Sequence, residues 1–141
     1  KSNIENRVPE KANIIKKGTD VLFISCGSIL KETLQAIDIL SSDFDCGLIN
    51  VHSLKPLDIG SLIDQFSIVD FIVTVEEHSI IGGIGSAVSE VIAQCQHNSQ
   101  LLMIGIPDVI VTQIGKRDYL LKHYNMDAKS IANRVSSLIS M

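Results

Sequence analysis

The chain has 141 residues, of which 45% are hydrophobic and 20% charged, so we expect one folded domain and little disorder. With 12 basic and 16 acidic residues the net charge is −4, which argues against a nucleic-acid partner. The longest apolar runs fall short of the roughly 20 residues that span a bilayer, and the opening residues hold no signal-peptide core, so we expect no membrane partner and a cytoplasmic location.

Three cysteines, Cys26, Cys46 and Cys95, stand far apart in the chain and among apolar neighbours. An odd number without CxxC spacing fits neither a disulfide framework nor a zinc site. We therefore expect small buried thiols that are not disulfide-bonded, as is typical of a reducing compartment, and we assign no metal ligand.

Strands and helices are predicted to alternate along the chain. Residues 1–19 are mostly polar and form a lead-in that ends in a short strand or turn, and four apolar runs follow at 20–26, 46–51, 71–75 and 101–106. Helical spacing and capping residues predict helices over 30–40, over a short segment after Asp58, over 84–95 and 116–123, and from about 127 onward. Strands apolar on both faces indicate an α/β sandwich with a mainly parallel sheet.

Capping residues and apolar stripes predict where the helices begin and which face they bury. Ser28 is expected to be the N-cap of the first long helix, which should end near Ser41, and Asp58 is expected to cap the second. The stripe of the first helix that should be buried consists of Leu30, Leu34, Ile37 and Leu40.

A glycine-rich segment leads from the third predicted strand into a helix. Its candidate anion, substrate or interface residues are Gly82, Gly83, Gly85 and Ser86. Ligands of open α/β sheets bind where strands end, and free N–H groups at a helix start can hold an anion. Alternatively, the glycines let the loop approach the sheet or a partner chain closely. A dinucleotide fingerprint is not indicated, because residues 76–81 separate the strand from the glycines.

Two histidines also follow predicted strands. His78 stands directly after Glu76 and Glu77, and an imidazole beside carboxylates can serve as an acid, a base or an anion partner. The structural alternative is that one glutamate caps the backbone N–H groups of the next turn while the other faces solvent. His52 could share a crevice with His78 or be an ordinary loop histidine.

The remaining patterns name no catalytic residue. A basic segment, Lys116, Arg117, Lys122 and His123, is interpreted as a solvated helix face, with a phosphate contact as the alternative. The sequence contains no P-loop, GxSxG elbow or HExxH, and no Gly-Asp-Gly with the Asn that would hold a magnesium diphosphate.

Five segments carry a resemblance: DVLFISCGSI (20–29), INVHSLKPLD (49–58), IVTVEEHSIIGGIGSAVSEVIA (72–93), IGIPD (104–108) and YLLKHYNMDAKSI (119–131). In this order and spacing, over about residues 12 to 140, the chain resembles the C-terminal domain of transketolase-type, thiamine-diphosphate-dependent enzymes. The EEHSIIGGIGS and KPLD segments are the most specific, and the EEH form resembles the C-terminal subunits of split transketolases most.

The resemblance implies a fold and a place in a larger enzyme. The implied fold is a three-layer α/β sandwich over residues 20–141, whose five-stranded sheet has four parallel strands and one antiparallel strand, with residues 1–19 as linker. The implied reaction moves a two-carbon ketol unit between sugar phosphates. Thiamine diphosphate and Mg²⁺ are expected to bind domains that are not in this chain, so no residue here is assigned as catalytic or cofactor-binding.

The same resemblance implies a scaffold role in a homodimer, with the N-terminal and middle domains or subunit of the same enzyme as partners, and an isolated chain that is inactive. Residues 109–115 depart from the family pattern, so no substrate contact is assigned to them. Two alternatives remain: a parent that is a 2-oxoacid dehydrogenase β subunit or a deoxyxylulose-phosphate synthase, or a regulatory module that binds an anion near His52, His78 and the glycine turn.

Overall fold

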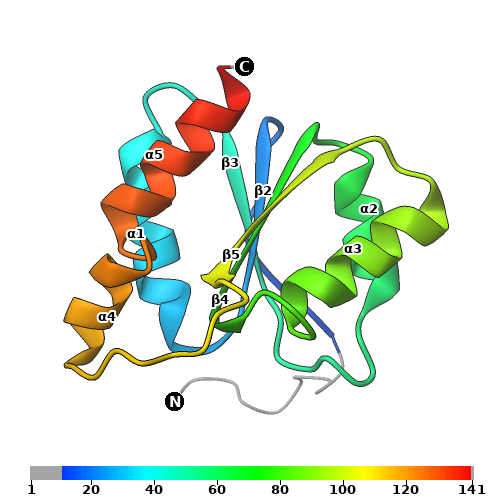
Figure 1. The fold of residues 1–141 in the computed structure, drawn as a ribbon. Helices are drawn as coiled ribbons and strands as arrows, with labels where there is room; N and C mark the ends of the chain where they lie inside the picture. The colour runs from blue at the N-terminus through cyan, green and yellow to red at the C-terminus, as the bar shows by residue number, and fades with distance from the viewer. Residues whose placement is uncertain (1–10, 141) are drawn as a thin grey trace, which may run out of the picture.

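The computed structural model describes residues 11–140, and its centre is a five-stranded sheet in the order β1-β3-β2-β4-β5 (Figure 1). The strands are β1 (Asn13–Lys16), β2 (Val21–Ser25), β3 (Cys46–Asn50), β4 (Phe71–Ser79) and β5 (Gln100–Ile106). β1 pairs antiparallel with β3, and the other neighbouring pairs are parallel. The expected mixed sheet is confirmed. The short strand expected at the end of the lead-in is β1, and residues 1–10 of that lead-in lie outside the described residues.

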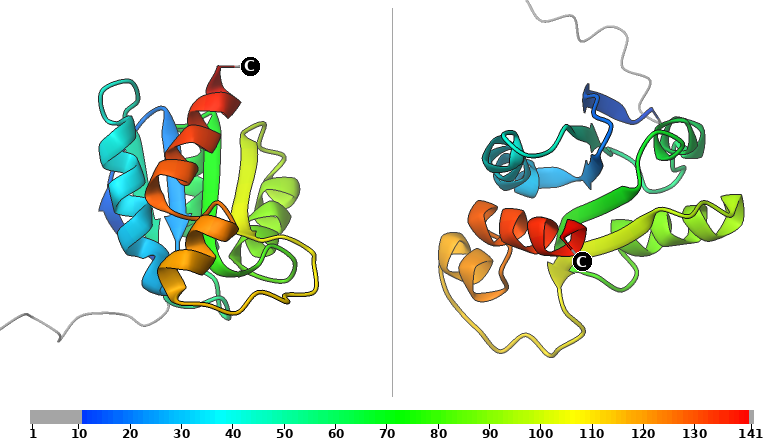
Figure 2. Two further views of the ribbon diagram at one scale, coloured as in Figure 1. Left: turned by 60° about the vertical axis from the view of Figure 1, so that its left-hand side comes forward. Right: turned by 90° about the horizontal axis from the view of Figure 1, so that it is seen from above.

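Helices cover both faces of the sheet, as Figure 1 shows and as the view from above in Figure 2 shows along another direction. A 3₁₀ turn, η1 (Gly27–Ile29), precedes α1 (Leu30–Leu40), and α1 lies on one face with α4 (Arg117–His123) and α5 (Ala128–Ile139). The other face carries α2 (Ile59–Phe66) and α3 (Ile84–Cys95). The structure is therefore the three-layer sandwich that the sequence predicts.

The core consists of two apolar clusters, one on each side of the sheet. The five residues of β2 are all buried. Val21 and Phe23 belong to the cluster with α1 and α5, whereas Leu22 and Ile24 belong to the cluster with α2 and α3. A strand buried on both faces uses branched aliphatics at successive positions, which explains the apolar, aromatic-poor composition.

The start and the buried face of α1 differ from prediction. Ser28 is not an N-cap: it lies within η1, its hydroxyl donates to Glu77, and the N-cap position is taken by Ile29. Leu34 is 40% exposed, because the face turned to the sheet has Thr33 and Ala36 at its centre. Thr33 can be buried there because its hydroxyl donates to the Ile29 carbonyl (3.0 Å).

The predicted cap at Asp58 is confirmed. One of its carboxylate oxygens accepts a hydrogen bond from the Ser61 N–H (3.2 Å), while the other accepts from the Ser61 hydroxyl (2.7 Å) and the Ala12 N–H (3.0 Å). These bonds lower the pKa of Asp58 below its ordinary value, and the bond from the Ser61 hydroxyl contributes most. Asp58 thereby joins the start of α2 to the segment that enters β1.

The three cysteines are free thiols, as predicted. Cys46 is fully buried, and this burial raises the pKa of its thiol to about 11. Cys26 and Cys95 are partly buried, and burial also raises the pKa of Cys26, with a smaller contribution from the charge of Glu76.

Candidate functional site at the carboxyl edge of the sheet

The carboxyl ends of the four parallel strands meet at one edge of the sheet, the lower edge in Figure 1. The segments 51–58, 80–83 and 107–116 leave the sheet there. The antiparallel β1 starts at the same edge, where the Ala12 N–H reaches Asp58. This edge therefore gathers the segments in which the sequence places its candidate residues.

Glu76 is a buried carboxylate that caps α3. The side chain is 2% exposed, and its two oxygens accept hydrogen bonds from the N–H groups of Ile84 (2.8 Å) and Gly85 (2.9 Å). A negative charge at a helix N-terminus also interacts favourably with the helix dipole. The N–H groups proposed for an external anion are thus held by the chain's own carboxylate, which supports the structural alternative for this glutamate.

Gly83 and Gly85 allow this close approach. A Cβ atom at Gly83 would overlap the Glu76 carboxylate, lying 2.6 Å from its Cδ. At Gly85 a Cβ atom would lie 2.7 Å from Sδ of Met103 and 3.0 Å from Oγ1 of Thr74. Both glycines are buried. Their role in the structure is therefore to let α3 lie against β4 and β5 with the carboxylate between them.

Glu77 points away from this cap and joins an ion-pair network with Arg117. The guanidinium donates through Nε to Glu77 (2.6 Å) and through Nη1 and Nη2 to Glu32 (2.9 and 3.0 Å). The hydrogen bond from Arg117 is the largest cause of the lowered pKa of Glu32, and the same bond raises the pKa of Arg117. Arg117 is therefore exposed, as the solvated-face interpretation of the basic segment expects, and it is also paired with two glutamates.

The other residues of the glycine turn bind mostly to one another. The Gly82 N–H donates to the Ser86 hydroxyl (2.8 Å), which in turn donates to the Ile80 carbonyl (3.2 Å). Gly82 has φ +78°, a left-handed conformation that glycine adopts at little cost. These bonds hold the turn closed, and His78 lies outside them, exposed, with Nδ1 2.9 Å from the Ser79 carbonyl oxygen.

The two candidate histidines lie on the surface of the domain. Both His52 and His78 are exposed, and neither lines the cavity between α1 and α5, the cavity between β5 and α5, or the groove between the 54–57 segment and α3. Their assignment to a common site stays a prediction.

A groove of about 740 Å³ lies between the 54–57 segment and α3. Gly82, Gly83 and Ser86 line it at the start of α3. The opposite wall is largely apolar, with Leu54, Pro56, Leu57 and Ile59. Three candidate residues thus face a groove whose walls suit an apolar contact better than a small anion.

The segment between β5 and α4 exposes large aliphatic side chains. Ile110 is 90% exposed, Ile114 is 95% exposed, and Val109 and Val111 are at least half exposed. Figure 2 shows this segment swinging out from the body of the domain. Its C-terminal end is held by the ion pairs of Arg117. The sequence analysis assigned these residues to no site, because residues 109–115 depart from the family pattern.

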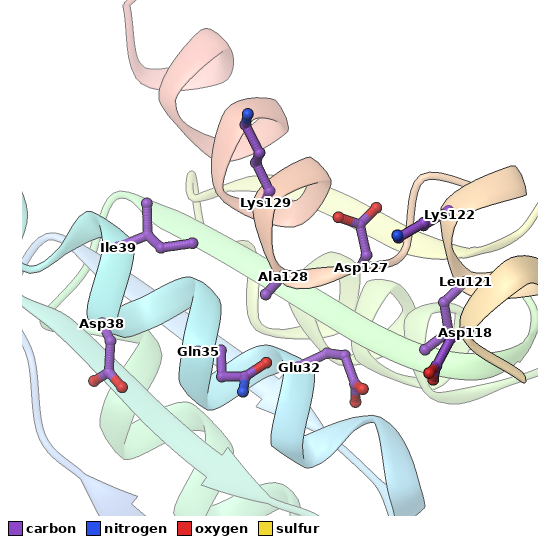
Figure 3. A pocket seen from close by; sticks show the side chains of 10 residues that line it. All are labelled: Glu32, Gln35, Asp38, Ile39, Asp118, Leu121, Lys122, Asp127, Ala128 and Lys129. Carbon is purple, nitrogen blue, oxygen red and sulfur yellow. The ribbon is translucent and has the colours of Figure 1, made fainter.

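The described residues do not fit a magnesium diphosphate. The N-terminus of α3 is closed by Glu76, and residues 11–140 contain no group of three or more His, Cys, Asp and Glu side chains placed to hold a metal ion. Figure 3 shows an acidic cavity of about 510 Å³ between α1, α4 and α5, whose lining holds four carboxylates and two lysines: Glu32, Asp38, Asp118, Asp127, Lys122 and Lys129. No helix in the described part of the chain is long and apolar enough to cross a membrane.

Comparison with known proteins identifies the family. The model of the transketolase C-terminal domain family matches residues 10–131. A protein of Methanocaldococcus jannaschii, provisionally named a transketolase C-terminal section, is 43% identical over 89% of this chain. The 1-deoxy-D-xylulose-5-phosphate synthase of Dictyoglomus thermophilum is 35% identical over 92% of this chain. A solved split-gene transketolase, described as an inactive β4 tetramer, superposes with a TM-score of 0.83 at 29% identity over 92% of this chain.

These relatives are longer than the chain described here. The match covers 39% of the M. jannaschii protein, 21% of the synthase and 42% of the split-gene subunit. The family match spans most of the fold, including the capped helix α3 and the strands around it. The chain therefore belongs to the transketolase C-terminal domain family.

Proposed function

We propose that the chain serves as the C-terminal scaffold of a thiamine-diphosphate-dependent enzyme that transfers a two-carbon ketol unit between sugar phosphates. The cofactor, with Mg²⁺, would be held by other parts of that enzyme and would supply the nucleophilic carbon that carries the ketol unit. The chain's own residues would position and shield neighbouring domains, and the isolated chain would be inactive. Its free thiols fit a cytoplasmic enzyme.

One observation carries this proposal: three carboxylates near the carboxyl edge are bonded within the domain, while several large aliphatic side chains are exposed there. Glu76 caps α3, and Glu77 and Glu32 are paired with Arg117. Carboxylates that are bonded within the domain in this way leave few groups at the surface for acid–base chemistry. The solved split-gene relative, described as an inactive tetramer, supports a C-terminal piece without activity of its own.

The apolar residues of this edge support docking to the remainder of the same enzyme. Ile110 and Ile114 are almost fully exposed, and Leu54 and Ile81 are 43% and 59% exposed. Exposed aliphatic patches of this kind mark interaction surfaces in soluble proteins. The described chain enters β1 at the same edge, and the relatives are more than twice as long. The preceding part of the enzyme is therefore the partner we propose, in an assembly that is a homodimer.

Calorimetry tests the assignment of the cofactor to other domains. Thiamine diphosphate and Mg²⁺, titrated into the 141-residue chain, should give no micromolar binding, and the chain alone should transfer no ketol unit. Activity should be restored when the remainder of the enzyme is supplied. Micromolar cofactor binding by the chain alone would contradict the proposal.

The docking surface is tested by the double substitution Ile110→Ser with Ile114→Ser. Burying one aliphatic side chain stabilises an interface by about 1.5–3 kcal/mol, so affinity for the remainder of the enzyme should fall tenfold or more. Ile39→Ser is the matched control, because Ile39 is 53% exposed on α1 and lies outside this edge. Equal affinities for the double variant and the control would refute the surface.

A second parent enzyme is supported by the synthase relative. The deoxyxylulose-phosphate synthase of D. thermophilum is 35% identical, so the domain fits that parent as well. The residues that select the substrate would lie in the remainder of the enzyme. Assays of the complete enzyme with a ketose phosphate and with pyruvate would separate ketol transfer from the synthase and 2-oxoacid alternatives.

A further inference from the structure

A second polar site is a cavity of about 420 Å³ between the edge strand β5 and the start of α5. One side is lined by Met103 and Gly105 of β5, by Pro107 directly after β5 and by Ile80 directly after β4, and Tyr124 and Asn125 line it from the turn before α5. From α5, the lining residues are Ser130, Asn133 and Arg134.

Arg134 is the only charged side chain that lines this cavity, and it has no carboxylate partner within the described residues. Its one hydrogen bond in that part of the chain runs from Nη2 to the Met103 carbonyl (3.3 Å). A guanidinium has five N–H donors. Partial burial lowers the pKa of Arg134, because the charged form loses hydration. The cavity thus holds a half-buried cation with most of its donors unused.

The surrounding groups add donors and no negative charge to the wall. Asn125 and Asn133, two uncharged polar residues, are also in its lining. The nearest carboxylate along α5, Asp127, accepts the Ser130 hydroxyl (2.5 Å) and lines the neighbouring acidic cavity instead (Figure 3). β5 is an edge strand, so its outer backbone groups are not paired within the sheet.

We propose that this Arg134 cavity binds a phosphate group, either as inorganic phosphate or as the monoester of a small metabolite. Arginine matches the oxygens of phosphate with two parallel hydrogen bonds. Asn125 and Asn133 are also in the lining, and amides can donate to the further acceptor oxygens that phosphate has and a carboxylate lacks. This inference does not rest on the proposed function of the domain.

Titration of the ¹⁵N-labelled 141-residue chain with inorganic phosphate at constant ionic strength tests the site. Saturable amide shifts should appear at Gly105, Ser130 and Asn133. Arg134→Gln should weaken binding at least tenfold. Lys129→Gln is the matched control, because it removes the same charge from α5 but Lys129 lines the acidic cavity of Figure 3. It should leave the dissociation constant within twofold.

Three results would overturn the site: no saturable shift at these residues, an equal loss in both variants, or shifts confined to Ile84–Ser86. Acetate at matched ionic strength must bind at least tenfold more weakly than phosphate. If it binds equally, the cavity accepts a carboxylate, such as an acidic side chain of a partner, and the phosphate assignment is wrong. Glycerol phosphate binding more tightly than inorganic phosphate would identify a monoester as the ligand, and the reverse order would identify free phosphate.

Discussion

The substitution Gly83→Ala tests whether the glycine turn exists to admit the Glu76 carboxylate. The added Cβ would overlap that carboxylate and lie 2.6 Å from its Cδ. The backbone at Gly83 has φ −98°, which any residue adopts, so the expected effect comes from the contact and not from the backbone angle. To make room, the carboxylate must leave the N–H groups of Ile84 and Gly85.

The expected cost follows from the two hydrogen bonds at stake. Hydrogen bonds to a charged group contribute about 1.5–3 kcal/mol each, and the Glu76 carboxylate is buried, so little water replaces them. Allowing for partial relaxation, we expect Gly83→Ala to lower the free energy of unfolding by about 2–5 kcal/mol. The free energy of unfolding of a domain of this size is about 5–15 kcal/mol, so the variant should still fold.

Urea unfolding followed by circular dichroism measures this change. Gly60→Ala is the matched control, because its Cβ would meet only Oδ1 of Asp58, at 3.9 Å, within α2. There the same substitution should be neutral or stabilise the domain by up to about 1 kcal/mol, since alanine favours the helix.

A double-mutant cycle with Glu76→Ala tests whether the cost of Gly83→Ala comes from contact with the Glu76 carboxylate. Without the carboxylate, Gly83→Ala should cost no more than about 1 kcal/mol, the difference between glycine and alanine at an N-cap. Equal costs in the two backgrounds would refute the reasoning, because the glycine would then be needed for something other than the carboxylate.

The remaining predictions concern other parts of the domain. Because the pKa of Glu32 is lowered in the folded state, its contribution to stability should be present at neutral pH and disappear as the pH falls through its folded pKa. Arg117→Gln should leave that carboxyl buried and unpaired and should weaken or reverse this acid dependence, as measured by urea midpoints between pH 3 and 7. The Cys46 thiol, with its pKa of about 11, should resist iodoacetamide at pH 8 until the protein is unfolded, as followed by mass spectrometry. Ile110→Ser and Ile114→Ser should leave the unfolding free energy of the isolated chain within about 0.5 kcal/mol, because these side chains contact little in it, and a larger loss would show that they pack inside the domain.

Local patterns in the sequence were sufficient for the framework. The run Val21–Ile24 is apolar at successive positions, which a strand buried on both faces requires, and the cap at Asp58 depends on a residue three positions away. For Glu76 and Glu77 the sequence offered, as one of two alternatives, that one side chain caps the next turn and the other faces solvent. It could not say which was which, because the predicted strand ended at residue 75, whereas β4 continues to Ser79 and carries the two side chains to opposite faces.

The tertiary structure alone decided the contacts between distant segments. Arg117 meets Glu32 across 85 positions of sequence, and Arg134 meets the Met103 carbonyl from a different layer of the sandwich. Isoleucine is among the residue types that are most often buried, yet Ile110 is 90% exposed. The physical reason is the same in each case. Hydrophobic spacing and capping patterns predict only the contacts between residues that are close in sequence, within one helical turn or one strand. Whether a charge is paired or an aliphatic side chain is covered depends on which elements the fold places side by side.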